Sequence, residues 1–374
     1  MGKNNNEFYN IQPILRYEVP YRIIIGERSN GKTYAVKDVC WDKHIDTGKK
    51  FVYVRKRTDS ISRKEMKRLW ADANEDYILD AVGDYVKYTP DKGFYYMKDD
   101  EIITIGYALS IEDYESKKGI PYNDITTIFF DEFIEKRGDL IDEVSKFLNL
   151  VSTIRRKRDD VEVFMVANTV SRFSPYFEEF GIDIKRLHQG EIVYIKHEMG
   201  VELAIEYCKS LNKEKGIRKK DRYFGFDHSP ASQMIMYGEW EYDVVNTKSV
   251  DGVGWNCSRR LIPMYLTALG EVYEMSLYEG KFSPIVFVRK INVQDGIVKN
   301  FIRYNLSYDD SLNLCTHDNC GKIQAVPKFA VVNDLMDKEM VEFWNVVKMC
   351  LKAKRVVFDN MRTGSDFSRI AKEL

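Results

Sequence analysis

Residues 21–33 read Tyr-Arg-Ile-Ile-Ile-Gly-Glu-Arg-Ser-Asn-Gly-Lys-Thr, a β-branched run that leads into a glycine-rich turn. The run at 21–25 predicts a short buried strand. Residues 26–33 match the pattern G-x-x-x-x-G-K-[ST] in full, and residues 33–43 are expected to be helical. A strand, a turn of this kind and a helix in direct succession predict a phosphate-binding loop within an α/β fold.

The positions of this loop have physical roles in holding a nucleoside triphosphate. The glycines let the backbone turn so that several N–H groups point toward phosphate oxygens, and the following helix adds the positive end of its dipole. Lys32 is expected to reach the β and γ phosphates, and the Thr33 hydroxyl to bind Mg²⁺. The predicted cofactors are therefore ATP and Mg²⁺. The predicted nucleotide contacts are Gly26, Glu27, Arg28, Ser29, Asn30, Gly31, Lys32, Thr33 and Tyr34.

An acidic pair follows a second apolar strand. Residues 125–130 form a continuous apolar run that ends at Asp131-Glu132. At the carboxyl end of a strand near the loop, Asp131 is expected to bind the Mg²⁺ ion. Glu132 is expected to orient and deprotonate the water that attacks the γ-phosphate. Because a small-molecule kinase needs no water-activating carboxylate, the pair favours ATP hydrolysis, and a P-loop kinase is the less favoured alternative.

Two further features belong to the same predicted sheet. Residues 161–167 predict a strand that ends at Asn168, whose amide is expected to sense the γ-phosphate or the attacking water. The basic run at 155–158, Arg-Arg-Lys-Arg, closes a helix predicted over 139–157. Its cations either complement the carboxyl end of that helix or include an arginine finger for the γ-phosphate of a neighbouring subunit. A finger that acts on a neighbour requires a ring or a filament.

Composition excludes several classes of protein. The 374 residues carry 57 Lys and Arg against 58 Asp and Glu, so any polyanion must be bound by local patches. No apolar run reaches the about 18 residues of a membrane span, and residues 1–7 lack the apolar stretch of a signal peptide. Six cysteines are too few for a disulfide scaffold. We therefore expect a cytosolic protein that is neither secreted nor in a membrane.

The pattern of the sequence changes near residue 190. Before it, strands that are apolar on both faces alternate with helices, which predicts a parallel sheet with helices on both faces. After it, a basic stretch is followed by a β-rich region that ends in helices. The predicted organisation is an ATPase domain over 1–190, a linker or lid over 191–222 and a separate α+β domain over 223–374.

Several segments, taken together and in order, resemble one protein family. They are residues 26–33, Phe51-Val52-Tyr53-Val54-Arg55, residues 126–134, Leu148-Asn149-Leu150, Asn168-Thr169-Val170 and Pro175-Tyr176-Phe177. On these residues the chain resembles the DNA packaging ATPases of small tailed phages of the phi29 type, which are terminase-like motors of the ASCE class of P-loop proteins. The likeness covers residues 8–185 well and is weaker beyond them.

The resemblance implies a homopentameric ring that docks on a viral prohead in the host cytoplasm and drives double-stranded DNA inward with ATP. It implies a second domain similar to a ribonuclease H-like nuclease that has lost catalysis. The prohead portal is an implied partner, and participation of a structural RNA is left open.

The resemblance also assigns roles to single residues. Arg156 falls at the place of the family's trans-acting arginine, with Arg158 as the second candidate. Lys118 sits where the family has a basic residue that faces the neighbouring subunit. Tyr9 and Gln12 resemble the segment that cradles adenine.

A ring that moves along DNA needs ionic contacts with phosphates that carry no sequence information. The candidate contacts are Lys213, Lys215, Arg218, Lys219 and Lys220 in the basic stretch, and Arg55, Lys56 and Arg57 after the second strand. The alternative for the first group is a solvated linker.

Two other chemistries have weaker signals. A terminase-like enzyme with an active nuclease would need converging carboxylates, and Asp227 and Asp359 are two candidates without a third. Cys315, His317 and Cys320 superficially suggest zinc, but a tetrahedral site wants four ligands, so a hairpin loop is favoured.

Overall fold

The computed structural model describes most of the chain in two compact units, residues 1–241 and 242–374, and each is described by itself. The described residues are 8–113, 122–135, 140, 142–172, 174–184, 186–217, 219–224, 226, 229–240, 264–268, 271–278, 284–291, 303–305 and 338–373. None of the described helices is both long and apolar enough to cross a lipid bilayer.

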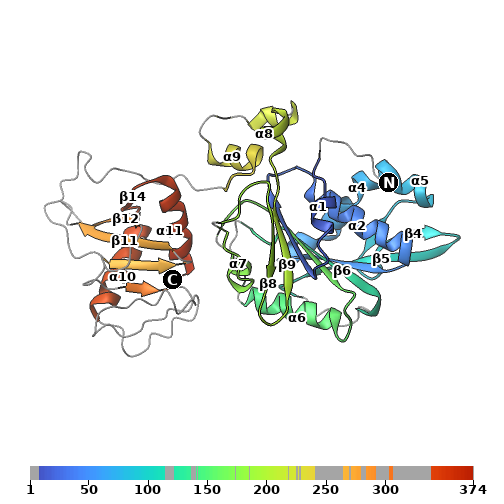
Figure 1. Ribbon diagram of the computed structural model, residues 1–374, viewed down its shortest axis with the longest axis horizontal. Helices are drawn as coiled ribbons and strands as arrows, with labels where there is room; N and C mark the ends of the chain where they lie inside the picture. The colour runs from blue at the N-terminus through green and yellow to red at the C-terminus, as the bar shows by residue number, and fades with distance from the viewer. Residues whose placement is uncertain are drawn as a thin grey trace. The chain divides into compact units, whose positions relative to one another are not determined.

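The first unit is built on one nine-stranded sheet in the order β3-β4-β5-β2-β6-β7-β1-β9-β8 (Figure 1). From β5 to β9 in that order every neighbouring pair is parallel, while β3, β4 and β8 pair antiparallel at the two edges. The strands are β1 (Tyr21–Gly26), β2 (Lys50–Arg55), β3 (Lys87–Thr89), β4 (Gly93–Lys98), β5 (Glu101–Ser110), β6 (Ile125–Asp131), β7 (Glu162–Asn168), β8 (Ile192–Lys196) and β9 (Glu202–Tyr207). This mostly parallel sheet confirms the predicted fold class.

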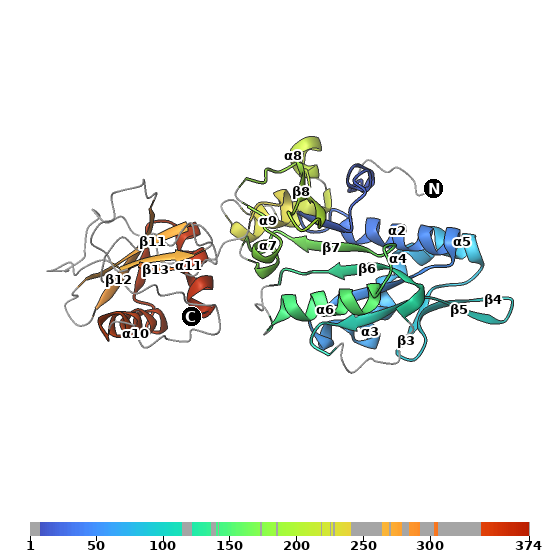
Figure 2. The same cartoon turned by 60° about the horizontal axis from the view of Figure 1, so that its bottom comes forward.

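Helices pack on both faces of the sheet, and Figure 2 shows α2 and α6 on opposite sides of β6 and β7. The helical segments are α1 (Gln12–Leu15), α2 (Lys32–Thr47), η1 (Thr58–Ile61), α3 (Arg63–Leu69), α4 (Ala71–Ala73), η2 (Asn74–Ile78), α5 (Leu79–Val82), η4 (Tyr122–Asp124), α6 (Glu143–Arg155), α7 (Pro175–Glu179), α8 (Leu211–Lys215), η5 (Lys219–Phe224) and α9 (Pro230–Tyr237). The connections between parallel strands supply α2, between β1 and β2, and α6, between β6 and β7, as a parallel sheet requires.

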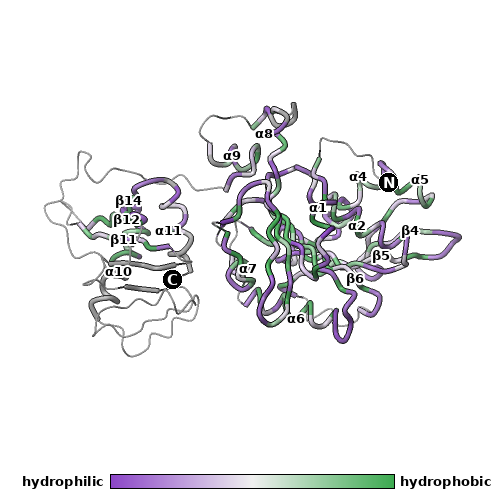
Figure 3. Tube along the Cα trace, viewed as in Figure 1, coloured by the Kyte–Doolittle hydropathy of each residue, from purple (hydrophilic) through white to green (hydrophobic). Residues whose placement is uncertain are grey.

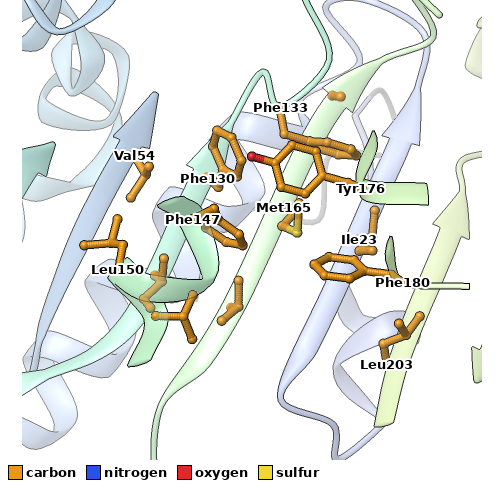
Figure 4. Close-up of a cluster of buried hydrophobic side chains, with 14 of the residues drawn as sticks. Ile23, Val54, Phe130, Phe133, Phe147, Leu150, Met165, Tyr176, Phe180 and Leu203 are labelled. Atoms are coloured by element: carbon orange, nitrogen blue, oxygen red, sulfur yellow. The ribbon is translucent and has the colours of Figure 1, made fainter. Parts of the chain in front are cut away.

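The core is divided by the sheet into two apolar clusters. Alternate residues of β1 face opposite sides, so Ile23 belongs to one cluster and Ile24 to the other. In the first cluster the rings of Phe130, Phe147 and Tyr176 pack against one another, with centroids 4.9, 5.5 and 5.7 Å apart (Figure 4). The central strands are accordingly the most continuously apolar part of this unit in Figure 3. Burial on both faces explains why these strands read as unbroken apolar runs.

The register of the parallel strands brings their carboxyl ends to one edge of the sheet. Gly26 at the end of β1 pairs with Asn168 at the end of β7. Asp131 at the end of β6 pairs with Val166, two residues before Asn168. Arg55 ends β2, the other neighbour of β6. The last residues of four adjoining strands therefore form one rim, at which ligands of open α/β sheets bind.

The compact first unit extends beyond the boundary that the sequence predicts at residue 190. β9 runs parallel to β1 over Tyr21↔Leu203 to Ile25↔Tyr207, so these residues are an integral part of the sheet and not a linker. The preceding β8 is only partly buried because it forms the edge. Helices α8 and α9 also belong to this unit.

The described part of the second unit is a mixed sheet with two helices. The sheet has the order β13-β10-β11-β12-β14, in which the middle three strands are antiparallel and the outer two pair in parallel. Its elements are β10 (Met264–Ala268), β11 (Glu271–Tyr278), β12 (Ile285–Ile291), β13 (Arg303–Asn305), α10 (Lys338–Lys352), β14 (Val356–Phe358) and α11 (Met361–Glu373). Phe367 of α11 packs against Tyr273 and Phe358. Its likeness to a ribonuclease H domain stays a prediction.

Candidate active site

The glycine-rich loop joins β1 to α2 with two residues in left-handed backbone conformations, Ser29 at φ 58° and Gly31 at φ 97°. A side chain at Gly31 would be strained by that φ and would also meet Phe8, whose Cβ lies 3.2 Å from the position of an added Cβ. An added Cβ at Gly26 would lie 2.8 Å from the Cβ of Cys208 on the neighbouring chain segment. Both glycines are therefore required by local geometry, one by conformation and one by close approach.

The Lys32 ammonium lies inside the loop and is almost completely buried. Its Nζ donates to the Glu27 carbonyl at 2.6 Å, to Asn30 Oδ1 at 3.0 Å and to Asn168 Oδ1 at 3.3 Å. Burial lowers the pKa of the ammonium, while Asp131 and other nearby acidic groups oppose that change. The structure thus brings together Lys32 and Asn168, which the sequence predicts at the ends of different strands.

Thr33 and Asp131 form the second part of the site. The Thr33 hydroxyl donates to Asp131 Oδ1 at 3.2 Å, and the Tyr53 hydroxyl donates to Asp131 Oδ2 at 2.9 Å. Burial raises the pKa of the Asp131 carboxyl. A hydroxyl and a carboxylate side by side are the hard oxygen donors that Mg²⁺ takes from proteins, with water and phosphate completing the shell. These two residues therefore fit a magnesium ion.

Glu132 follows Asp131 with a left-handed backbone at φ 53°. Its carboxylate forms an ion pair with the Arg55 guanidinium, and Arg55 Nη1 also donates to the Tyr53 hydroxyl at 3.2 Å. The Glu132 side chain is 44% exposed, whereas that of Arg55 is 16% exposed. Arg55 thus faces Glu132 within the site, and its contact with DNA stays a prediction.

The sequence of this site matches a known family. Residues 3–223 match the family described as Podovirus DNA encapsidation protein (Gp16). The chain belongs to this Gp16 family. The match includes every residue of the site described above.

Two curated relatives carry the description DNA packaging protein. That of Bacillus phage phi29 is 31% identical over 183 residues, which are 47% of this chain and 50% of the relative. That of Bacillus phage B103 is 31% identical over 173 residues, 45% of this chain and 50% of the relative. The chain spans about half the length of the curated relatives it matches.

A solved structure gives a likeness over nearly the whole chain. A chain of the bacteriophage Phi-29 viral genome packaging motor assembly aligns with a TM-score of 0.53 at 18% identity, covering 98% of this chain and 99% of that one. At this level of identity the comparison indicates a shared fold.

Lys56 of this Gp16-family chain is wrongly predicted as a DNA contact. Its ammonium is fully buried, with Nζ 2.8 Å from Glu143 Oε1 at the start of α6 and 5.9 Å from the centre of the Tyr176 ring. Glu143 is buried as well. The next residue, Arg57, pairs with Glu135 through Nε at 3.4 Å and is partly exposed. Lys56 is therefore a structural cation that ties β2 to α6.

Lys56→Ala is expected to lower the free energy of unfolding by about 3–5 kcal/mol, because it leaves Glu143 as an uncompensated buried charge. Urea unfolding of the purified chain measures this loss. The matched double change Lys56→Met with Glu143→Leu should cost much less, since neither charge remains. If Lys56→Ala changed stability by less than about 0.5 kcal/mol, as at an ordinary surface position, the structural role would be wrong.

The two predicted finger arginines differ in their surroundings. The Arg158 guanidinium lies 2.7 Å from each of the carbonyls of Asn123, Ile125 and Ile154, and 3.2 Å from that of Tyr122. It is therefore engaged in holding the end of α6 to the start of β6, which argues against a role in a neighbour's site. Arg156 is exposed, with φ 48° and ψ −111°.

Segments that border the loop include the residues predicted to cradle adenine. The Tyr9 amide donates to the Asn30 carbonyl at 2.8 Å, and the Tyr9 hydroxyl donates to Glu206 Oε2 at 2.6 Å. Gln12 begins α1 and is exposed. The Tyr34 hydroxyl donates to Asp76 Oδ2 at 2.6 Å. Arg28 is exposed at the turn of the loop.

The remaining predicted residues fall into three groups. Lys213 is half-exposed and bonds with Gln189 and Glu239. Lys215, Lys219 and Lys220 lie in α8 and η5. Arg218, Lys118, Asp227, Cys315, His317 and Cys320 lie outside the described residues.

The described residues give no support to a nuclease centre. Asp359 is exposed and accepts from the Asn360 amide at 2.7 Å. Within the described part of both units, no three His, Cys, Asp or Glu side chains come together as possible metal ligands. Glu271 and Glu274 of the second unit are buried, and they pair with Lys290 and Arg289.

Sequence reasoning missed Tyr53 and the role of Arg55. Both lie on β2, whose residues 51–55 carry part of the family resemblance but no motif that assigns them a chemical role. Their spacing of two residues puts them on the same face of the strand, toward the end of β6. The signal that could have found them is this pair of polar groups at the end of an otherwise apolar strand that neighbours the acidic strand.

Proposed function

We propose that this chain is the ATPase subunit of a motor that moves double-stranded viral DNA into a prohead. The observation that carries the proposal is the convergence of Lys32, at the start of α2, with Asp131 and Asn168 at the ends of β6 and β7. Glu132 follows Asp131 directly. Membership of the Gp16 family and the DNA packaging description of its relatives support DNA packaging as the process that hydrolysis would drive.

The proposed chemistry assigns one task to each group. Lys32 and the amides of the loop bind the phosphates. Thr33 and Asp131 hold Mg²⁺, which when bound neutralises charge on the phosphate oxygens. Glu132 orients the attacking water and takes its proton. Asn168 senses whether the γ-phosphate is bound, because its Oδ1 already accepts a hydrogen bond from the Lys32 ammonium.

Glu132 can act as the general base only after its ion pair with Arg55 is broken. The carboxylate oxygen that contacts the guanidinium is not available to the attacking water. The pair therefore describes a resting arrangement, and substrate binding must redirect either side chain before hydrolysis.

Arg156 is proposed as the arginine finger of a homo-oligomer, with a pentameric ring as the proposed state. Arg158, its near neighbour, bonds with the first residue of β6, so this basic run lies at the edge of the sheet where the strands begin. β6 has 7 residues, and at about 3.3 Å per residue the phosphate loop is roughly 20 Å away. An arginine at this distance can complete only the site of another subunit.

Further partners follow from the same proposal. The exposed Lys213 and the other cations of the basic stretch, Lys215 among them, would contact DNA phosphates, and Lys118 would face the neighbouring subunit. The prohead portal, and a structural RNA if one participates, would hold the ring in place in the host cytoplasm. The proposed domain organisation keeps a vestigial nuclease-like second domain.

A packaging assay tests the proposal. The purified chain is incubated with empty proheads, portal, ATP and linear duplex DNA, and the DNA that becomes protected from added nuclease is measured. Protection should require ATP and fall steeply as salt rises, because phosphate contacts release counterions. Release of phosphate without protection at any salt would overturn the motor function, and phosphorylation of an acceptor molecule would indicate a kinase.

A further inference from the structure

Glu27, the first variable residue of the phosphate loop, has a fully buried carboxylate. Its Oε2 accepts a hydrogen bond of 2.7 Å from the Ser210 hydroxyl, and its Oε1 accepts one of 3.3 Å from the Leu211 amide. Ser210 is the residue that caps the start of α8. A side chain that the sequence predicts as a nucleotide contact therefore fastens the loop to α8.

The end of α9 closes over the same residue. Gly238 has φ +66°, and an added Cβ there would lie 2.7 Å from the Glu27 amide nitrogen. The Tyr207 hydroxyl donates to the Gly238 carbonyl at 2.6 Å. Asn212 Nδ2 donates to the Met236 carbonyl at 2.7 Å, and Ser210 Oγ lies 3.5 Å from the same carbonyl. The residues next to Glu27 thus also hold the last turn of α9.

The backbone of Glu27 is bound to the cation that would receive the phosphates. An ammonium has three hydrogens to donate, and those of Lys32 are directed at three protein acceptors, of which the Glu27 carbonyl at 2.6 Å is the nearest. Phosphate oxygens can be bound only when Lys32 releases at least one of them. Release of the Glu27 carbonyl would free the same residue whose carboxylate holds α8 and whose amide abuts Gly238.

We propose that Glu27 is a positioning residue that couples occupancy of the phosphate loop to α8 and α9. This inference rests on the proposed function, because it requires the loop to bind a triphosphate. The coupling also accounts for a carboxylate in a buried position, where its hydrogen bonds offset the cost of desolvation.

Hydrogen exchange in the full chain tests the coupling. The exchange rates of the α9 amides are measured with and without ATPγS, and ATPγS binding is measured separately by fluorescence titration. In the wild type, ATPγS should raise the exchange rates of α9 by roughly tenfold, as expected when an interaction with a charged group is lost. In Ser210→Ala and in Glu27→Gln, α9 should exchange rapidly already without nucleotide, and ATPγS should change its rates less than about twofold.

Ser229→Ala is the matched control. Ser229 caps α9 as Ser210 caps α8, accepting from the Ser232 amide at 3.3 Å, but it is not bonded to Glu27. This variant should retain the response of α9 to ATPγS. The double variant Glu27→Gln with Ser210→Ala should resemble either single variant, because both substitutions disrupt the same hydrogen bond between Ser210 and Glu27.

Two results would overturn the coupling while leaving the proposed function intact. One is a wild type that binds ATPγS without any change in α9, and the other is a full response in both Glu27→Gln and Ser210→Ala. A wild type that does not bind ATPγS would instead overturn the proposed function, and the coupling with it.

Discussion

Glu132→Gln is expected to lower the ATP turnover number by about 10²–10⁴-fold, because an amide cannot take the proton of the attacking water. Lys32 and Thr33 are unchanged, so the affinity for ATP should change by only a few-fold. Phosphate release from the purified chain in the presence of duplex DNA measures turnover, and titration with a fluorescent ATP analogue measures affinity.

Glu135→Gln provides the matched control for this change. Glu135 is three positions along the same chain segment and pairs with Arg57 instead of Arg55. Its replacement should leave turnover close to that of the wild type. If Glu132→Gln hydrolysed ATP as fast as Glu135→Gln did, Glu132 would not be the general base.

Arg156→Gly and Arg156→Ala are both expected to lower ATP turnover of the assembled motor by about 10³–10⁵-fold, the usual effect of losing an arginine finger. They should differ in stability. Arg156 has φ 48° and ψ −111°, which glycine adopts without strain, so the glycine variant should be about 1–3 kcal/mol more stable than the alanine variant. Turnover on proheads and thermal unfolding measure the two effects separately.

Assemblies that mix two variants show whether Arg156 acts on the site of its own subunit or on that of a neighbour. Lys32→Ala supplies an intact Arg156 and an inactive pocket, whereas Arg156→Gly supplies the reverse. If the arginine acts on a neighbour, mixing the two inactive variants should restore part of the turnover. No recovery at any mixing ratio, with both variants incorporated, would contradict a finger in trans.

The parts of the site that carry motifs were predictable from the sequence. Gly31, Lys32, Thr33 and Asp131 have proposed roles that follow from the chemistry of a phosphate and a metal ion. Asp131 ends an apolar strand, and the other three lie in the loop and helix that follow another. The placement of Asn168 beside Lys32 was predictable for the same reason, since strand ends of a parallel sheet meet at one edge.

The basic residues could not be assigned from the sequence. Arg55, Lys56 and Arg57 are adjacent in the chain, but their partners Glu132, Glu143 and Glu135 lie far along the chain. Whether a cation is solvated or buried depends on such distant partners, which no local pattern contains. The same reason explains Glu27, whose partner Ser210 is 183 positions away.

The strand order has a consequence for how the protein is made. β1 lies between β7 and β9, so it has no strand partner until the ribosome has reached β7, which ends at Asn168. At about 5–20 residues per second, a ribosome needs on the order of ten seconds to supply the intervening residues. Contacts of such high sequence separation also slow folding. The nascent chain therefore emerges with its apolar β1 unpaired for that period, when chaperones would have most to protect.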